Sequence, residues 1–130
     1  MSRPILVDSS WYIAKMRIGE DPLALLRILA QSRDLVTCGV VKAEVGRGMR
    51  NEKALKQLEA LWSCMLYIDD GYKRWEATMA LAWTLDREGV VLPLTDLHIA
   101  VCAMHAGAVV LTYDQHFQRI PGIDATDRIF

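Results

Sequence analysis

Four acidic side chains that are far apart in the sequence are candidates for metal binding and catalysis: Asp8, Glu44, Asp96 and Asp114. Each follows an apolar run typical of a buried strand or lies early in a stretch with helical periodicity. Carboxylates that meet within a few ångströms raise one another's pKa and destabilise a fold unless a cation neutralises them. Oxygen ligands without a supporting set of cysteines and histidines select Mg²⁺ or Mn²⁺.

A metal ion held by these carboxylates would supply hydrolytic chemistry. Such an ion lowers the pKa of a bound water, orients it for in-line attack on a phosphodiester and stabilises the leaving oxygen. Helix N-termini beside Glu44 and Asp96 would add partial positive charge toward a phosphate. Zinc is disfavoured, because His98, His105 and His116 show no ligand spacing with the cysteines.

Alternating strands and helices must bring the four acids together. Buried strands are predicted at 5–7, 35–38, 65–68 and 109–112, and helices at 9–17, 22–29, 40–49, 54–62, 71–89 and 95–106. Ser9 or Ser10 is the predicted N-cap of the first helix and Thr95 that of the last, which is predicted to end at Gly107. This order is typical of an α/β fold, here a central parallel sheet of four to five short strands with helices on both faces. Ligands bind beyond the carboxyl ends of the strands in such sheets, so we expect all four acids at one edge.

Length and composition favour one globular domain over residues 1–130. Hydrophobic residues make up 52% and charged residues 24% of the chain, which excludes a disordered protein. No apolar run reaches the roughly 20 residues that cross a bilayer, and the N-terminus lacks the features of a signal peptide. Three apolar-flanked cysteines, Cys38, Cys64 and Cys102, are predicted to be buried free thiols of a cytoplasmic protein.

The acids lie in segments that resemble the motifs of PIN-domain ribonucleases. These segments are LVDSS around Asp8, VVKAEVGRG around Glu44, and LPLTDLHIAVCAMHAGAVVLTYDQHF with Asp96 and Asp114. Length and motif order are similar to the VapC-type toxins of bacterial and archaeal toxin–antitoxin pairs. The resemblance spans residues 5 to about 123, and its last segment is the most specific part.

The resemblance implies a Mg²⁺- or Mn²⁺-dependent endoribonuclease. It also implies a homodimer, inhibited by an antitoxin protein whose C-terminal segment occupies the site. The four acids match its metal-binding and catalytic positions, Thr112 a position that orients a ligand or a metal-bound water, and Ser9 a neighbouring polar position. Family members often read T-x-D-x-D-F where this chain reads TYDQHF, so His116 replaces a further acid. A second metal ion is therefore not implied, and His116 becomes a candidate contact for phosphate or metal.

An RNA substrate requires local positive charge, because the formal net charge of the chain is −1. Basic residues bracket Glu44 or end the first helix: Lys42, Arg47, Arg50, Lys53, Lys15 and Arg17. Trp11 and Tyr12 could stack on a base, although aromatic packing in the core is the commoner use of such residues.

Other functions remain open on the same fold. A catalytically silent interaction module is one, because a helix cap at Asp8 or a first-turn acid at Asp96 would explain each acid singly. A receiver-like phosphoacceptor domain needs paired acids after the first strand and a lysine after the last, which LVDSS and LTYDQHF lack. An aspartate-nucleophile phosphatase normally shows D-x-D, and Ser10 replaces the second acid. Without a P-loop or G-x-G-x-x-G, no nucleotide cofactor is expected. Asp70 is predicted to be an ordinary turn residue.

Overall fold

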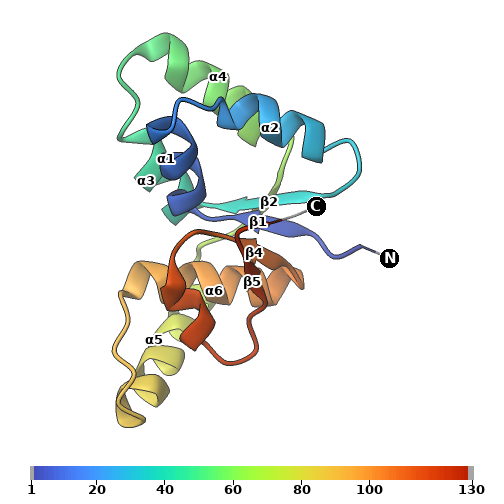
Figure 1. Cartoon of the computed structure of the whole chain (residues 1–130). Helices are drawn as coiled ribbons and strands as arrows, with labels where there is room; N and C mark the ends of the chain where they lie inside the picture. Colours follow the sequence, from blue (N-terminus) through green and yellow to red (C-terminus); the bar gives the residue numbers. More distant parts are fainter. Residues whose placement is uncertain (1, 129–130) are drawn as a thin grey trace.

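A five-stranded parallel sheet forms the centre of the molecule, in a computed structural model that describes residues 2–128 (Figure 1). Its strand order is β3-β2-β1-β4-β5, and every neighbouring pair is parallel. The strands are β1 (Ile5–Val7), β2 (Leu35–Cys38), β3 (Leu66–Ile68), β4 (Val109–Leu111) and β5 (Ala125–Thr126). The first four confirm the predicted strands within about one residue, whereas β5 was not predicted.

Helices cover both faces of this sheet, as the sequence predicted. The helices are α1 (Ser9–Arg17), α2 (Pro22–Leu29), α3 (Gly39–Gly46), α4 (Glu52–Trp62), α5 (Tyr72–Arg87) and α6 (Leu94–Ala106), with a 3₁₀ helix η1 (Gln115–Arg119) after β4. Helices α1 to α4 lie on one side of the sheet, and α5 and α6 lie on the other (Figure 1). The α/β class with a parallel sheet between two helical layers is therefore confirmed.

The core lies around the central strands. Ile5, Leu6 and Val7 of β1 have no exposed surface, as expected for a parallel strand covered on both faces. Trp11 and Tyr12 of α1 are 5% and 0% exposed, so these aromatic residues pack in the core and cannot stack on a base.

Two predicted helix caps are wrong. Helix α1 starts after Asp8, whose carboxylate accepts a hydrogen bond from the Ser10 N–H, so neither serine is the N-cap. Helix α6 starts at Leu94 after Pro93 and has no side-chain cap, although Thr95 was expected to provide one. A left-handed glycine, Gly107, ends α6 as predicted (φ 64°).

The strand order reverses at β1. From β1 the chain moves outward through β2 to β3 and then returns to β4 on the other side of β1. Such a reversal separates the connecting segments at the carboxyl ends of the two central strands and leaves room for a ligand there. Val7 pairs with Leu111 at these ends, and the Asp8 N–H donates to the Leu111 carbonyl at 2.9 Å.

The cysteines are only partly as expected. Cys38 and Cys102 are buried, but Cys64 is exposed because it lies in the turn that follows α4. No helix in residues 2–128 has the length and apolarity to span a membrane.

Candidate active site at the carboxyl edge of the sheet

Asp8 is held at the end of β1 through one of its two carboxylate oxygens. Its Oδ2 accepts hydrogen bonds from Ser10 Oγ at 2.7 Å, from Thr112 Oγ1 at 2.8 Å and from the Ser10 N–H at 3.3 Å. Its Oδ1 accepts none from the described residues. Because Asp8 is only 2% exposed, this arrangement fixes the carboxylate and leaves its Oδ1 without a hydrogen bond from the described residues.

Thr112 and Ser10 connect the ends of β1 and β4. Thr112 Oγ1 accepts the Asp114 N–H at 2.9 Å, while Ser10 Oγ accepts the Tyr113 N–H at 3.0 Å. Thr112 thus holds the Asp8 carboxylate through its hydroxyl. The role of Ser10 was missed, and the D-x-S spacing at a helix start was the available signal, because it allows serine to bond the preceding carboxylate.

Asp96, Asp114 and His116 form the tightest group of this edge. One ligand atom from each lies within 4.8 Å of the other two. His116 Nδ1 lies 2.7 Å from Asp96 Oδ2 and 3.1 Å from Asp114 Oδ1, so the imidazole sits between the two carboxylates. Asp114 also caps η1 by accepting the His116 N–H at 2.9 Å.

Charge is concentrated at this group. Burial, together with the nearby charges of Asp114 and Asp8, raises the pKa of Asp96 to about 6, although the hydrogen bond from His116 opposes the rise. That hydrogen bond to Asp96 raises the pKa of His116 above its ordinary value, and the charge of Asp114 adds to the effect. The acids therefore carry excess negative charge that a cation would relieve.

Glu44 approaches the edge from the other helical layer. Its Oε1 accepts a hydrogen bond from Ser9 Oγ at 2.7 Å, so Ser9 links Glu44 to the residue next to Asp8. Among the described residues Glu44 lies outside the group of Asp96, Asp114 and His116. It is also the sixth of the eight residues of α3, so the expected help from that helix N-terminus is wrong.

Comparison with known proteins decides the family. The model of the PIN domain family matches residues 5–123, nearly the whole chain. The chain belongs to the PIN domain family. Its sequence matches no curated protein. The predicted resemblance to PIN domains is thereby confirmed.

Solved structures of toxin–antitoxin proteins share this PIN fold. VapBC2 from Rickettsia felis, bound to a promoter DNA fragment, has a TM-score of 0.74 and 21% identity, covering 94% of this chain and 96% of its own. DNA-bound VapBC from Salmonella typhimurium has a TM-score of 0.74 and 23% identity, with coverages of 96% and 98%. The sarcin–ricin loop cleaving toxin VapC20 of Mycobacterium tuberculosis has a TM-score of 0.66 and 16% identity, with coverages of 90% and 95%.

The donor set of this PIN domain fits a hard divalent cation. Each of the four carboxylates uses one oxygen for a protein hydrogen bond: Asp8 Oδ2, Glu44 Oε1, Asp96 Oδ2 and Asp114 Oδ1. The other oxygen of each accepts no hydrogen bond from the described residues. Carboxylates oriented in this way and left with a free oxygen are suited to Mg²⁺ or Mn²⁺.

The basic residues divide into separate sets. A groove of about 540 Å³ is lined by Arg17, Glu44 and Arg50, among others. Arg47 is exposed at the C-cap of α3. Lys42 is placed differently, because its ammonium packs over the rings of Trp62 and Tyr67 (5.7 and 5.2 Å to the ring centroids).

Two lysines lie apart from this groove. Lys53 lines a separate depression with Lys56 on α4. Lys15 lies over the ring of Tyr113, 5.6 Å from its centroid, and a hydrogen bond with Tyr113 raises the pKa of Lys15. The Lys15 ammonium also lies 3.4 Å from Glu20 Oε2, so its charge is already paired within the chain.

Proposed function

We propose that this PIN domain is a single-domain, Mg²⁺- or Mn²⁺-dependent endoribonuclease, the toxin of a toxin–antitoxin pair. The observation that supports the proposal is the pair of Asp96 and Asp114 at the carboxyl edge of the sheet, near enough to Asp8 for its charge to raise the pKa of Asp96. Glu44 lies outside this group and is linked to the same edge through Ser9. PIN domains are nucleases that generally use divalent metals, and a structural relative is described as a toxin that cleaves the sarcin–ricin loop.

Asp8, Asp96 and Asp114 would hold the metal ion, with Glu44 as the fourth acid. When bound, the ion would supply an activated water and stabilise the developing charge on the leaving oxygen. Thr112 keeps Asp8 in position, since its hydroxyl donates to Oδ2 at 2.8 Å. Positioning of this kind typically changes metal affinity or activity by about 10- to 100-fold.

His116 is assigned to the phosphate of the substrate. Its Nδ1 side is engaged by Asp96 and Asp114, and these partners favour the protonated ring. Its side chain is 43% exposed, and Nε2 has no hydrogen-bond partner among the described residues. A charged imidazole with a free N–H can donate to a phosphate oxygen next to the acids.

RNA would approach through the groove that Arg17, Glu44 and Arg50 line. Positive side chains there bind the backbone without reading its sequence. Arg47 extends this surface, and Ser9 holds Glu44 at its edge. Lys42 would contribute only long-range attraction, because its ammonium is engaged with the rings of Trp62 and Tyr67. An RNA substrate places the protein in the cytoplasm.

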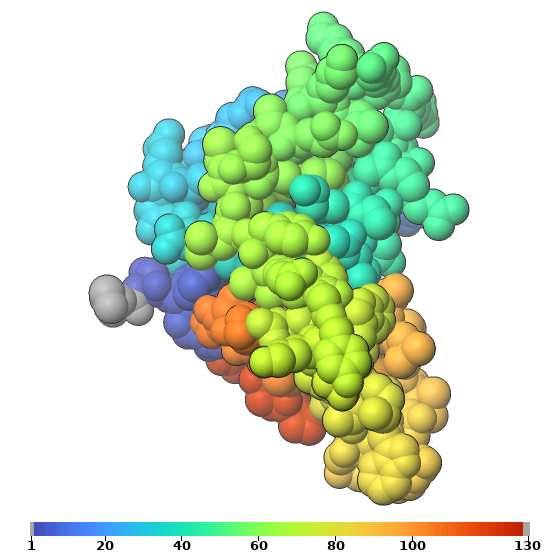
Figure 2. Space-filling model, turned by 180° about the vertical axis from the view of Figure 1, so that it is seen from behind, coloured from blue at the N-terminus to red at the C-terminus, as the bar shows by residue number. Residues whose placement is uncertain are grey.

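Two protein partners belong to the proposal. The VapBC relatives include an antitoxin, and a C-terminal antitoxin segment would occupy the site of this chain as well. A second copy of the chain would cover α5, where Tyr72, Trp75, Met79 and Trp83 expose 44–76% of their surface at spacings of three or four residues. In Figure 2 the yellow-green to yellow atoms of this segment run uncovered down the surface.

The direct test is RNA cleavage by the purified protein. We expect divalent-metal-dependent cutting that is lost in EDTA and in Asp8→Asn and Asp96→Asn, while both variants keep the circular dichroism spectrum of the wild type. Asp86→Asn is the matched control, because it neutralises an exposed carboxylate on α5 away from the site. Undiminished cleavage in EDTA, or in both site variants, would reject a metal-dependent nuclease.

A silent interaction module is the second candidate, and His116 is the observation that favours it. Its imidazole already bridges Asp96 and Asp114 and could neutralise them without metal. Titration calorimetry with Mn²⁺ separates the two functions. Binding that disappears in Asp8→Asn supports the nuclease, whereas no binding by the wild type supports the silent module.

A further inference from the structure

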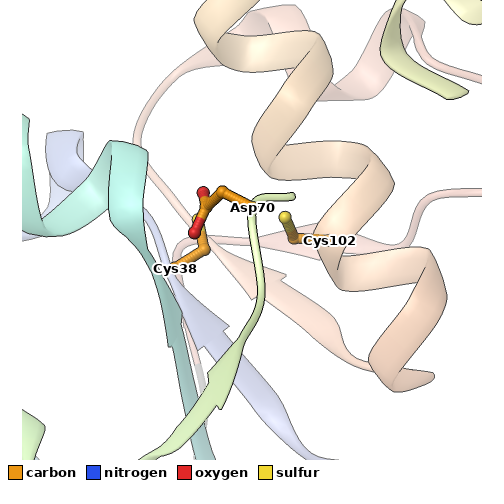
Figure 3. A group of neighbouring side chains, drawn as sticks. All are labelled: Cys38, Asp70 and Cys102. Atoms are coloured by element: carbon orange, nitrogen blue, oxygen red, sulfur yellow. The ribbon is translucent and has the colours of Figure 1, made fainter. Parts of the chain in front are cut away.

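A second group of ligand-type side chains lies apart from the four acids. Cys38 ends β2, Asp70 follows β3, and Cys102 lies in α6, yet one ligand atom of each lies within 4.8 Å of the other two. Figure 3 shows these three side chains converging from three different segments. His98 lies one turn before Cys102 on α6, with Nε2 2.9 Å from Asp70 Oδ2 and 3.7 Å from Cys102 Sγ.

The hydrogen bonds around His98 determine which ring nitrogen carries the proton of the neutral imidazole. Thr78 Oγ1 lies 2.8 Å from the Arg74 carbonyl, which can only accept, so the Thr78 hydroxyl donates its single proton there. His98 Nδ1, 3.0 Å from the same oxygen, must then carry the proton of that contact. In a neutral imidazole Nε2 is consequently an acceptor that faces a carboxylate oxygen, and this contact becomes favourable when the ring is protonated or when a metal cation binds between the two atoms.

Asp70 is fixed so that one oxygen points at this group. Its Oδ1 accepts the Gly39 N–H and the Tyr67 hydroxyl, both at 2.7 Å. A Cβ at position 39 would lie 2.8 Å from Oδ1, so the close approach requires glycine. Oδ2 receives only a long contact of 3.4 Å from the Val40 N–H besides His98. Asp70 is therefore more than a turn residue, contrary to the prediction from sequence.

We propose that Cys38, Asp70, His98 and Cys102 bind one zinc-type divalent cation. Two thiolates, an imidazole and a carboxylate are a donor set typical of Zn²⁺. Tetrahedral zinc places a sulfur about 3.6 Å from a nitrogen ligand and a nitrogen about 3.3 Å from an oxygen ligand. The distances of 3.7 Å (Cys102 Sγ to His98 Nε2) and 2.9 Å (His98 Nε2 to Asp70 Oδ2) need adjustments of only a few tenths of an ångström. The four ligand atoms do not all lie within 4.8 Å of one another, so a larger shift must bring His98 into the group of Cys38, Asp70 and Cys102.

Charge and second-sphere contacts agree with this site. Binding Zn²⁺ releases the two thiol protons, so the group carries one net negative charge before and after the exchange. Thr78 holds the distal nitrogen of His98, and Tyr67 and Gly39 hold the second oxygen of Asp70. Ligands oriented by such partners are the rule in metal sites. Trp75 stacks on the His98 ring at 3.9 Å between centroids and excludes water from that side.

The site is closed and therefore structural. Cys38, His98 and Cys102 have no exposed surface, and the Asp70 side chain is 16% exposed. No position is left open for a substrate, in contrast to catalytic zinc sites. The ion would tie α6 to the ends of β2 and β3.

Metal analysis of protein purified without chelators, from cells supplied with zinc, tests the proposal. We expect about one zinc per chain, lost in Cys38→Ser and in Cys102→Ser. Cys64→Ser is the matched control and should keep its zinc, because Cys64 is exposed in the turn after α4. Asp8→Asn should also keep its zinc, because Asp8 does not belong to the zinc site. The zinc proposal can therefore fail without the nuclease proposal, and the reverse.

A second measurement on the wild-type chain remains decisive if the cysteine variants do not fold. Substituted Co²⁺ should give thiolate-to-cobalt charge-transfer absorption, and a mercurial titration of the holoprotein should release zinc as the two buried thiols react. Zinc-free protein that fails to bind Co²⁺ with such absorption would overturn the proposal, leaving a protonated His98 between Asp70 and neutral thiols. A Cys38–Cys102 disulfide in protein isolated under reducing conditions would overturn it equally.

Discussion

Replacing Asp96 by asparagine should stabilise the metal-free fold while it removes metal binding. The side chain is 13% exposed and lies near Asp114 and Asp8. In the folded chain its ionised form is disfavoured, because burial and the two like charges outweigh the hydrogen bond from His116. Asparagine keeps an oxygen that can accept that hydrogen bond but carries no charge. If Asp96 were needed for the fold, its replacement by asparagine would instead lower the stability of the metal-free protein.

The size of the effect follows from the pKa. A rise from the ordinary 3.8 to about 6 corresponds to about 3 kcal/mol of unfavourable ionisation. Solvent screening at the edge of the sheet reduces this to about 1–2 kcal/mol. For a chain of this length, with an unfolding entropy of about 2.1 cal/mol/K per residue, Asp96→Asn should raise the Tm by about 4–7 °C in EDTA at pH 7.5.

The difference in stability between the wild type and Asp96→Asn should depend on pH. A carboxyl whose folded pKa is raised contributes stability below its unfolded pKa, and that contribution is lost as the pH rises through the folded value. The wild type should therefore equal Asp96→Asn near pH 4 and fall behind it progressively up to about pH 6. Above that pH the difference should stay constant.

Thermal unfolding in EDTA and in Mn²⁺ measures both halves of this prediction. Mn²⁺ should raise the Tm of the wild type, by linkage to the folded state, and leave that of Asp96→Asn unchanged. Asp86→Asn, which removes an exposed charge on α5, should respond to Mn²⁺ like the wild type. A lower Tm for Asp96→Asn in EDTA at pH 7.5 would refute the reasoning, because Asp96 would then be a structural acid.

Three further predictions concern orientation, substrate and assembly. Thr112→Val removes the hydroxyl that holds Asp8 and should reduce RNA cleavage about 10- to 100-fold at saturating metal. Thr112→Ser keeps a hydroxyl and should retain most of the cleavage activity. Equal cleavage rates for both variants would exclude the orienting role. Charge reversal of Arg17 and Arg50 should weaken RNA binding, as measured by filter binding. The slope of log binding constant against log salt concentration should become shallower by about 0.7 for each phosphate that is no longer neutralised. Lys53→Glu, in a separate depression, is the control. The double variant Met79→Gln, Trp83→Gln on α5 should convert a dimer to a monomer in sedimentation equilibrium. Met104→Gln, at an exposed methionine on α6, should leave the dimer intact. An unchanged mass of the double variant would show that α5 does not form the interface.

Sequence patterns predicted those features of the fold that local chemistry determines. Buried parallel strands read as short apolar runs, which located β1, β2 and β4, and Gly107 marked the end of α6. Strand β5 was missed because two residues form no recognisable run. The exposure of Cys64 was missed because its apolar neighbours belong to the end of α4 and the approach to β3, whereas Cys64 lies in the turn between them.

The candidate site was predictable to the extent that topology alone brings residues together. Parallel strands share a carboxyl edge, so Asp8, Asp96 and Asp114 could be expected there from their places in the chain. What could not be predicted is the orientation of side chains, such as the position of His116 between two acids. The zinc-type group was missed for the same reason, since only the i, i+4 spacing of His98 and Cys102 is visible in the sequence.

Helix α6 connects the two sites that these residues form. Asp96 and His98 are two residues apart, which places them about 200° apart around the helix axis and on opposite sides of α6. One side therefore faces the acids and the other the group of Cys38, Asp70 and Cys102. Because the distance of Asp96 from Asp8 depends on where α6 rests, an ion that ties α6 to β2 would also set the spacing of the nuclease acids. Loss of zinc should then weaken Mn²⁺ binding in Cys102→Ser, and unchanged Mn²⁺ affinity would show that the sheet alone positions α6.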